Sequence, residues 1–279
     1  MHRVPCVDDY LKSFTFTELD TSNQISYLSK HEKMFHEICE TEDAKRVAKF
    51  LRERSETVNV DCYDEYGWSA LMRAAYLGRN DVVRTLLSFG ATAYVSTVIV
   101  KSKEFGDERD RVPNGSGLHA ACLCRSLGCD DVVATLLAAG ISQTVASGIS
   151  VGQDWPPLHC ACYCKEENER NERVVRSLLN QRDADVTACD RSGITALHLC
   201  ARLGNARLTK CMLRNISDDS AWMGMTNEVV NARDHMNGST PLHEASYVLS
   251  HSNSLDTRTI TLSTRTLFFG AVATDTIES

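Results

Sequence analysis

A motif built around Leu-His and followed by small residues recurs along this 279-residue chain, each time in the same setting. Its copies lie in the segments 67–75, 116–122, 156–162, 193–201 and 238–246, and in the first of them Met72 stands where the others have His. A repeated unit of this kind cannot bury its apolar face alone and becomes stable by stacking on its neighbours. The recurrence therefore predicts a stack of units and argues against an enzyme built around one pocket.

A second apolar signal follows each motif at a short distance. The pattern Val-Val-x-x-Leu-Leu occurs at 82–87, 132–137 and 174–179, and it weakens to Leu208-x-x-x-Met212-Leu213 in the next unit. An earlier unit lacks the signature turn but keeps the spacing, with Phe35-His36 followed by Val47-x-x-Phe50-Leu51. These six units are numbered in chain order.

Both apolar signals have the spacing of one-sided helices, and Gly78 or Gly204 marks the joint between them. Each unit is therefore expected to be a pair of short helices. The spacing predicts helices over 69–77 and 80–88, 117–125 and 130–138, 157–164 and 171–180, and 196–203 and 206–213.

The two linked motifs resemble the ankyrin repeat, whose pattern is Gly-x-Thr-Pro-Leu-His-x-Ala-Ala-x-x-Gly followed by Val-Val-x-x-Leu-Leu-x-x-Gly-Ala. The resemblance covers residues 33–248. It implies an all-α fold, an ankyrin-repeat solenoid of stacked helix-turn-helix units with extended finger loops. About five and a half units are expected, because no second apolar signal follows the sixth motif at His243.

The units are longer than the family period of about 33 residues. The residues in the His slot (36, 72, 119, 159, 198 and 243) are 36, 47, 40, 39 and 45 apart. Most of the excess lies between Gly90-Ala91 and Asn114 and between Leu213 and Gly238, where the family has its fingers. Smaller insertions, Arg125 to Gly128 and Lys165 to Asn171, fall in the joint between two helices. Insertions of this kind are expected on loops.

The two ends of the chain depart from the pattern. Residues 1–32 are expected to form an N-terminal cap or irregular segment, with a helix before Met34 that covers the first unit. Residues 249–279 form a Ser/Thr-rich tail, expected to be poorly ordered or strand-like around 257–272. The incomplete sixth unit suggests a truncated product of a longer repeat protein. The alternative is a tail that folds over the open end through Leu267-Phe268-Phe269.

Composition favours a soluble protein inside the cell. The chain is 43% hydrophobic and 24% charged, which is enough to form a core. It contains no apolar run near the roughly 18 residues of a membrane helix, and its first residues lack the apolar segment of a signal peptide. We therefore expect no membrane insertion and a location in the cytoplasm or the nucleus.

The recurrent Cys and His residues are interpreted as structural. Cys122, Cys162 and Cys200 occupy slots where ankyrin units place Ala, and burial is predicted for Ala75, Cys122, Cys162 and Ala201. The alternative is a metal site at His119-x-x-Cys122-x-Cys124 or His159-Cys160-x-Cys162-x-Cys164, but residues two apart on a helix point to different sides. The resemblance implies that Ser116, Thr195 and Thr240 hydrogen-bond to the His three residues later.

Searches for catalytic chemistry find no phosphate loop, no His-Glu-x-x-His and no Gly-x-Ser-x-Gly motif. The acidic run 166–173 is interpreted as a solvated loop between helices. We expect no enzyme activity, no cofactor, no metal and no small-molecule substrate. With a net charge of −7 and no basic stripe, direct nucleic-acid binding is not expected, although a basic segment of another protein could bind.

The resemblance places partner binding on the concave groove, at positions 7, 6 and 4 before the His slot and 4 and 5 after it. Exposed aromatic side chains beside Arg are typical of interface hot spots. The alternative is that the aromatic rings pack against the fingers. The predicted partner-binding residues are Tyr66, Trp68, Tyr76, Leu77, Leu123, Trp155, Tyr163, Ile194, Arg202 and Leu203.

These observations predict a non-enzymatic intracellular scaffold or adaptor that binds another protein through the groove. The alternative is a truncated regulatory ankyrin domain of a larger enzyme, channel or signalling protein. The identity of the partner does not follow from the fold.

Overall fold

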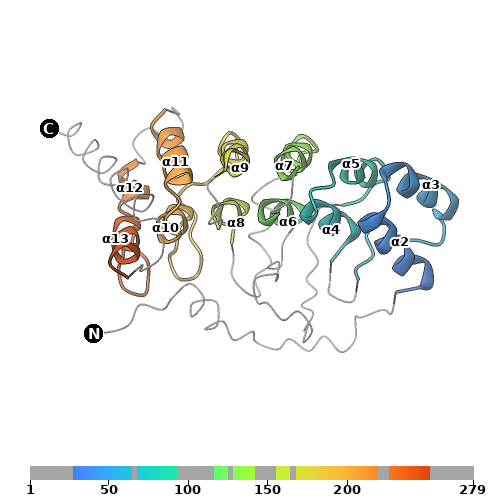
Figure 1. The fold of residues 1–279 in the computed structure, drawn as a ribbon, viewed down its shortest axis with the longest axis horizontal. Helices are drawn as coiled ribbons and strands as arrows, with labels where there is room; N and C mark the ends of the chain where they lie inside the picture. The colour runs from blue at the N-terminus through green and yellow to red at the C-terminus, as the bar shows by residue number, and fades with distance from the viewer. Residues whose placement is uncertain are drawn as a thin grey trace.

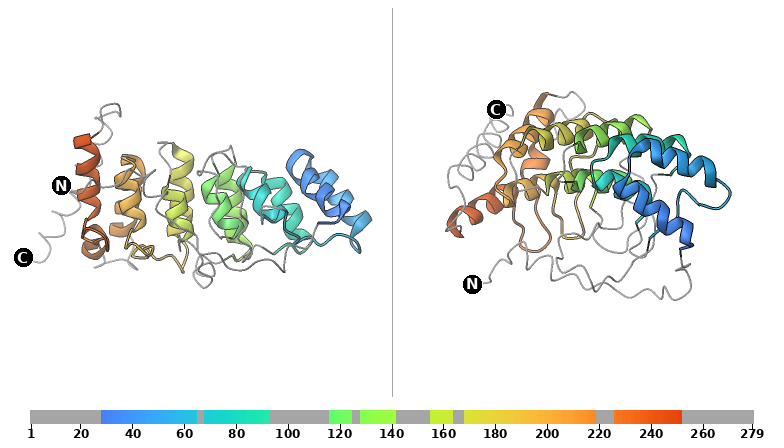
Figure 2. Two further views of the ribbon diagram at one scale, coloured as in Figure 1. Left: turned by 90° about the horizontal axis from the view of Figure 1, so that it is seen from below. Right: turned by 45° about the vertical axis from the view of Figure 1, so that its right-hand side comes forward.

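The computed structural model describes residues 28–64, 68–92, 116–124, 128–141, 155–163, 168–218 and 226–251. Within them the helices form two rows along one axis (Figure 1 and Figure 2). The first helix of each unit lies in one row and the second helix in the other, so that each helix packs against the helices of neighbouring units. The described residues contain isolated bridges but no strand, and the fold is an all-α solenoid.

The helix pairs lie where the apolar spacing predicts them. The first-helix row contains α2 (Lys30–Thr41), α4 (Ala70–Tyr76), α6 (Gly117–Leu123), α8 (Pro157–Cys162), α10 (Ala196–Arg202) and α13 (Pro241–His251). The second-helix row contains α3 (Ala44–Arg54), α5 (Asn80–Ser88), α7 (Cys129–Ala138), α9 (Glu169–Leu179) and α11 (Ala206–Asp218). Every helix predicted between residues 69 and 213 is present, which confirms the helix pairs.

The sequence determines where a first helix begins and ends, as α10 shows. At its N-cap the Thr195 hydroxyl accepts the His198 backbone N–H, which satisfies one of the donors that a helix start leaves unpaired. At its other end Gly204 has a φ of 70° and donates its N–H back to the Ala201 carbonyl. Gly78 adopts the same left-handed conformation after α4. Only glycine accepts this conformation without strain, so the joint predicted at these glycines is confirmed.

The core follows the axis of the stack between the two rows. Ala75, Cys162 and Ala201 have 0% exposure and Cys122 has 9%, which confirms that these small side chains are buried. The Cys162 thiol donates to the Met212 sulfur at 3.6 Å, so it lies in contact with a second helix of the next unit. The cysteines of this row therefore act as small apolar side chains.

The first unit's own helix, α2, contains Met34 and begins at Lys30. The expectation that the insertions are loops is corrected for one of them. The insertion between Leu213 and Gly238 is partly helical, because α11 continues to Asp218 and a short helix α12 (Thr226–Val230) follows. Val229 and Val230 are buried, so apolar packing explains α12.

The acidic run 166–173 is also not entirely a loop. From Glu169 onward it forms the first turns of α9, whose N-cap is Asn168, and acidic residues are favourable at a helix start. The segments 1–27 and 252–279, and the long insertion 93–115, lie outside the described residues. The expected N-terminal cap and the expected form of the tail fall within these segments.

Cys162 gives a direct test of the packing. Replacing Cys162 by Leu adds volume at a position with 0% exposure, and we expect a loss of about 1 to 3 kcal/mol in the free energy of unfolding. Cys189, which is exposed, gives the matched control. Urea denaturation of Cys162→Leu and Cys189→Leu measures both effects, and equal stability of the two variants would contradict the packing model.

Candidate partner-binding groove

A buried histidine joins each of the later described units to the next one. The ring of His119 in α6 lies with its Nε2 3.0 Å from the backbone carbonyl of Trp155, in the unit that follows. The carbonyl can only accept, so Nε2 carries the proton and donates it. Each acceptor stands four residues before the next His slot, at the base of a finger. The equivalent bonds run from His159 to the Ile194 carbonyl at 2.9 Å and from His198 to the Ser239 carbonyl at 3.0 Å.

The other ring nitrogen faces the start of the histidine's own helix. Nδ1 of His119 accepts the Ser116 backbone N–H at 3.0 Å, and Nδ1 of His198 accepts the Thr195 N–H at 3.2 Å. The predicted bonds between Ser or Thr and His are therefore confirmed, and they hold each ring neutral. A proton on Nδ1 would point at the backbone N–H of Ser116 or Thr195, so the charged form of the ring is disfavoured.

Unit four departs from this arrangement because Pro156 replaces the Ser or Thr. Proline offers neither an N–H nor a hydroxyl. Nδ1 of His159 consequently has no hydrogen-bond partner among the described residues. A buried acceptor without a partner costs stability.

Burial makes these histidines hard to protonate. It lowers the pKa of His119 to about 4, because the charged ring would lose its hydration, although the bond to the Trp155 carbonyl acts in the opposite direction. Burial also lowers the pKa of His159 and of His198, and their carbonyl partners again offset part of the effect. All three rings are uncharged at neutral pH.

An aspartate turn shapes the finger bases of units two and five. The carboxylate of Asp190 accepts the backbone N–H groups of Ser192 at 2.8 Å and Ile194 at 3.0 Å. Asp64 accepts from the Trp68 N–H at 2.8 Å in the second unit. The turn around Asp190 needs a φ of 76° at Gly193, where an added Cβ would lie 2.8 Å from the next finger's backbone nitrogen at His235. The fingers of units five and six are thus packed against each other.

A tryptophan and a tyrosine form an edge-on pair in each of two units. Trp68 and Tyr76 have ring centroids 5.4 Å apart at 71°, and Trp155 and Tyr163 have centroids 5.2 Å apart at 63°. In both units the tryptophan lies at the finger base and the tyrosine at the end of the first helix. The Trp155 indole N–H also donates to Asp190 at 3.2 Å. The two rings of each pair therefore pack on one another, and Trp155 also reaches the aspartate turn of the next unit.

The tyrosines belong to an apolar stripe along the groove. Tyr76, Leu123 and Tyr163 follow the His slot by four residues in units two, three and four, and all three are half-buried against the core. We call these three residues the apolar stripe. Their helices α4, α6 and α8 are successive neighbours in the first-helix row.

An ion pair closes each end of the apolar stripe. In the first unit Glu40 stands at the stripe position and pairs with Arg73 at 3.0 Å. In the fifth unit Arg202 stands there and pairs with Glu244 at 2.9 Å. The two pairs use the same positions of adjoining units with the charges exchanged, so this row of positions is apolar in the middle and neutralised at both ends.

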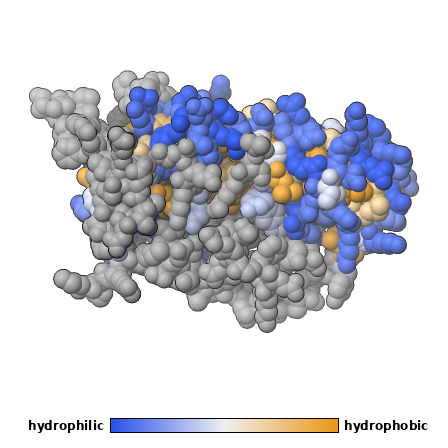
Figure 3. Space-filling view, in the orientation of Figure 1, coloured by the Kyte–Doolittle hydropathy of each residue, from blue (hydrophilic) through white to orange (hydrophobic). Residues whose placement is uncertain are grey.

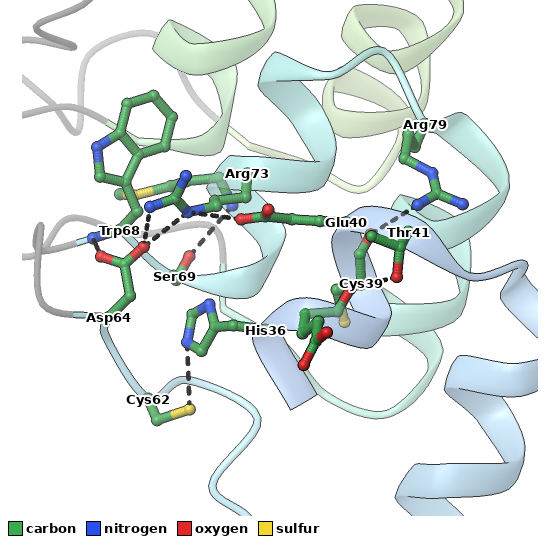
Figure 4. A network of polar contacts seen from close by, with 12 residues as sticks. His36, Cys39, Glu40, Thr41, Cys62, Asp64, Trp68, Ser69, Arg73 and Arg79 are labelled. Carbon is green, nitrogen blue, oxygen red and sulfur yellow. Dashed lines mark hydrogen bonds and ion pairs between the residues drawn. The ribbon is translucent and has the colours of Figure 1, made fainter. Parts of the chain in front are cut away.

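Figure 4 shows how Arg73 organises the N-terminal end of the groove. Besides Glu40 it contacts the carboxylate of Asp64, with Nε at 2.6 Å, and its guanidinium lies 5.6 Å from the Trp68 ring centroid. Arg79 donates to the Cys39 carbonyl at 3.1 Å, near the end of α2. Arginine contacts therefore join the first two units.

The predicted partner-binding residues fall into groups by exposure. Leu77 is 38% exposed, and Trp68, Tyr76, Leu123 and Tyr163 are half-buried with part of each side chain accessible. Trp155, Ile194 and Leu203 retain 7%, 1% and 9% exposure, so these three side chains offer almost no surface to a partner in this structure. Arg202 is committed to its ion pair. Tyr66 lies outside the described residues.

The burial of Trp155 and Ile194 has a physical cause. The backbone carbonyls of Trp155 and Ile194 accept from the histidines of the preceding unit, which draws their finger bases onto the core. Met236, which the register places seven residues before the His slot of the sixth unit, is 60% accessible. Sequence reasoning omitted the flanking ion pairs. The exchanged charges at equal positions of units one and two and of units five and six were the signal that could have found the ion pairs.

Comparisons with known proteins agree with this architecture. A family model for ankyrin repeats in three copies matches residues 158–257, and a single ankyrin repeat model matches residues 66–97. No curated protein matches the sequence. Three solved structures that resemble the chain are 17–21% identical to it.

The ankyrin repeat domain of human ASB11 is 17% identical, with a TM-score of 0.59 over 95% of this chain and 90% of that one. The ankyrin repeat domain of Bcl-3, a member of the IkappaB protein family, is 21% identical, with a TM-score of 0.57 over 85% of each chain. A chain in the complex of the Bdellovibrio bacteriovorus endopeptidase Bd0816 with the immunity protein Bd3460 is 18% identical. Its TM-score is 0.55 over 84% of this chain and 97% of that one. These likenesses show the fold.

The motifs, the two rows of helices and the family models lead to one assignment: the chain is an ankyrin repeat protein. Ankyrin repeats are protein-interaction modules and are typically non-catalytic. Among the described residues no helix is long and apolar enough to cross a membrane. In the same residues no cluster of three or more His, Cys, Asp and Glu side chains could hold a metal ion.

The lowered histidine pKa values predict a pH-dependent stability. Unfolded histidine titrates near pH 6.5, so the unfolded chain binds more protons than the folded chain below that pH, and stability falls as the pH drops toward 4. Between about pH 7.5 and about pH 5.5, His119 alone should account for roughly 1 kcal/mol of lost unfolding free energy. Urea titrations at both pH values measure the loss, and equal or greater stability at the lower pH would contradict it.

Pro156 predicts a stabilising substitution. Pro156→Thr restores an N–H and a hydroxyl beside Nδ1 of His159, and we expect a gain of about 1 kcal/mol in unfolding free energy. Pro156→Ala restores the N–H alone and serves as the matched control. The same urea titration compares the variants, and a threonine variant no more stable than the alanine variant would refute the role of the missing hydroxyl.

Proposed function

We propose that this protein is a non-enzymatic scaffold or adaptor that binds another protein in its groove, with the apolar stripe as the centre of contact. The observation that carries the proposal is the distribution of polarity along equivalent positions. Tyr76, Leu123 and Tyr163 lie between two ion pairs. Glu40 pairs with Arg73 at one end, and Arg202 pairs with Glu244 at the other. A hydrophobic centre with a polar border is the arrangement found in protein interfaces.

The aromatic members of the stripe are suited to binding. Each tyrosine is held edge-on by a tryptophan of its own unit, with centroids 5.4 Å and 5.2 Å apart, so little rotamer freedom remains to be lost when a partner binds. Leu77, 38% exposed beside Tyr76, adds apolar surface. Trp155 and Ile194 support the groove from within through their buried side chains and their backbone bonds to the preceding unit.

The structural relatives support a role in protein binding by analogy. One of them comes from a complex between an endopeptidase and an immunity protein, which supports a role in binding another protein by analogy alone. The cysteines support a site of action inside the cell. The ten described cysteines are free thiols, which are typical of proteins in reducing compartments.

Affinity capture with the full chain tests the proposal. A partner that contacts the stripe should be captured from cell extract by the natural chain and by Leu137→Ala, but only weakly by Leu123→Ala. Both leucines are half-buried, and they lie in different rows, on α6 and α7. Equal capture by the two variants would exclude the stripe as the binding surface.

The tyrosines give the quantitative prediction. Alanine at Tyr76 or Tyr163 removes a ring held in position for contact, and binding of the captured partner should weaken by about 2 kcal/mol, while the unfolding free energy changes by about 1 kcal/mol or less. Phenylalanine at the same positions keeps the ring and is the matched control. Calorimetric titration and urea denaturation measure the two quantities. Lost stability with unchanged binding would mean that the rings serve the fold alone.

A further inference from the structure

The second-helix row carries an unusual surface at its N-terminal end. On α3 the side chains of Lys45, Lys49 and Arg52 are exposed, and they follow one another at the four- and three-residue spacing that places them in one line along a helix. We call these three residues the basic stripe. The opposite face of α3 is buried through Val47, Phe50 and Leu51. From its sequence the chain is expected to have no basic stripe, and this expectation is wrong for α3.

The positive charge extends beyond these three residues. Arg46 is exposed beside the basic stripe, and Arg84 is exposed on α5, which packs directly against α3. Helix α3 holds five basic residues and one acidic residue, in a chain whose net charge is −7. Figure 3 shows a hydrophilic surface on the α2 and α3 side of the molecule.

Elsewhere in the same row three arginines are neutralised within the protein. Arg173 pairs with Asp130 at 2.8 Å, and Arg176 pairs with Glu172 at 2.8 Å. Arg207 reaches the same Glu172 at 2.7 Å. These pairs connect α7, α9 and α11.

The basic stripe has almost no such partners. Among the described residues no ion pair involves Lys45, Arg46, Arg52 or Arg84, and Lys49 reaches only the exposed Glu53, at 3.8 Å. Like charges four residues apart on a helix destabilise it by a few tenths of a kcal/mol. The fold therefore gains nothing from this arrangement, whereas the pairs on α9 show the arrangement that stabilises it.

We propose that the outer surface of α3 and α5 is a second docking surface, which binds an acidic segment of another protein. The surface belongs to the second-helix row, and the groove lies along the first helices and fingers, so this proposal stands apart from the groove. Carboxylate side chains of a bound segment would supply the counter-charges that the chain itself supplies to Arg173, Arg176 and Arg207.

The size of the surface favours an acidic peptide over a nucleic acid. The stripe from Lys45 to Arg52 spans roughly 10 Å along the helix at about 1.5 Å per residue, which matches a short peptide. Nucleic acid binding draws on many phosphate contacts and, for single strands, on aromatic rings for stacking. The described exposed residues of α3 and α5 include no aromatic side chain, and the net charge of −7 opposes a polyphosphate.

The test compares two variants of the full chain that lose the same charge in different places. Lys45→Gln, Lys49→Gln and Arg52→Gln remove the basic stripe, whereas Arg173→Gln, Arg176→Gln and Arg207→Gln remove three cations that are already paired. Fluorescence anisotropy at low salt measures the affinity of each chain for a labelled polyglutamate peptide. Circular dichroism confirms that both variants fold.

We expect the natural chain and the paired-cation variant to bind polyglutamate with similar affinity. The stripe variant should bind it at least about tenfold more weakly. Added salt should weaken the binding of the natural chain, because it screens exposed charges. Equal affinities of the two variants, or no binding by the natural chain, would overturn the proposal. Tighter binding of the natural chain to an oligodeoxythymidine or to anionic vesicles than to polyglutamate would overturn it as well.

Discussion

The hydrogen bond from a buried histidine to the next unit's finger base is the interaction on which the described stack depends most. It satisfies a ring nitrogen and a backbone carbonyl that would otherwise be buried without partners, and it does so three times, from His119, His159 and His198. Because the acceptor always stands four residues before the next His slot, each bond fixes one unit relative to its neighbour. The positions of the finger bases, and with them the floor of the groove, follow from this repetition.

The same bond explains why equal positions play different roles along the chain. At Trp155 and Ile194 it holds the residue against the core, and the side chain becomes part of the support. At Trp68 the preceding unit offers His36, whose Nε2 lies 3.5 Å from the Cys62 sulfur. The Asp64 turn and the Arg73 guanidinium hold Trp68 there, and its ring keeps more exposure.

Much of the fold could be predicted from the sequence because each unit repeats the same local rules. The apolar spacing located the helices, the glycines located the joints, and the small residues at Ala75, Cys162 and Ala201 marked the contacts between units. The insertions could not be predicted in this way, since they lack a repeated partner. The helix α12 formed where Val229 and Val230 reach the core, which depends on neighbours that are distant in the sequence.

The binding surface was predicted less completely for a similar reason. A register position identifies which backbone site faces the groove, but exposure depends on what the side chain meets. Ile194 and Leu203 occupy groove positions and are covered, and Arg202 is neutralised by Glu244 of the following unit. The charge line on α3 was visible in the sequence at Lys45, Lys49 and Arg52. Only the structure showed that Arg173, Arg176 and Arg207 in that row are paired, whereas the cations of the basic stripe have almost no ion pairs.

Hydrogen–deuterium exchange of the full chain, free and bound to a partner captured through the groove, tests the central claim most directly. We predict slower exchange in the bound state at the backbone amides of α4, α6 and α8, which carry the apolar stripe, with little change in α7 and α9. Protection confined to α7 and α9, with α4, α6 and α8 unchanged, would contradict a groove centred on Tyr76, Leu123 and Tyr163.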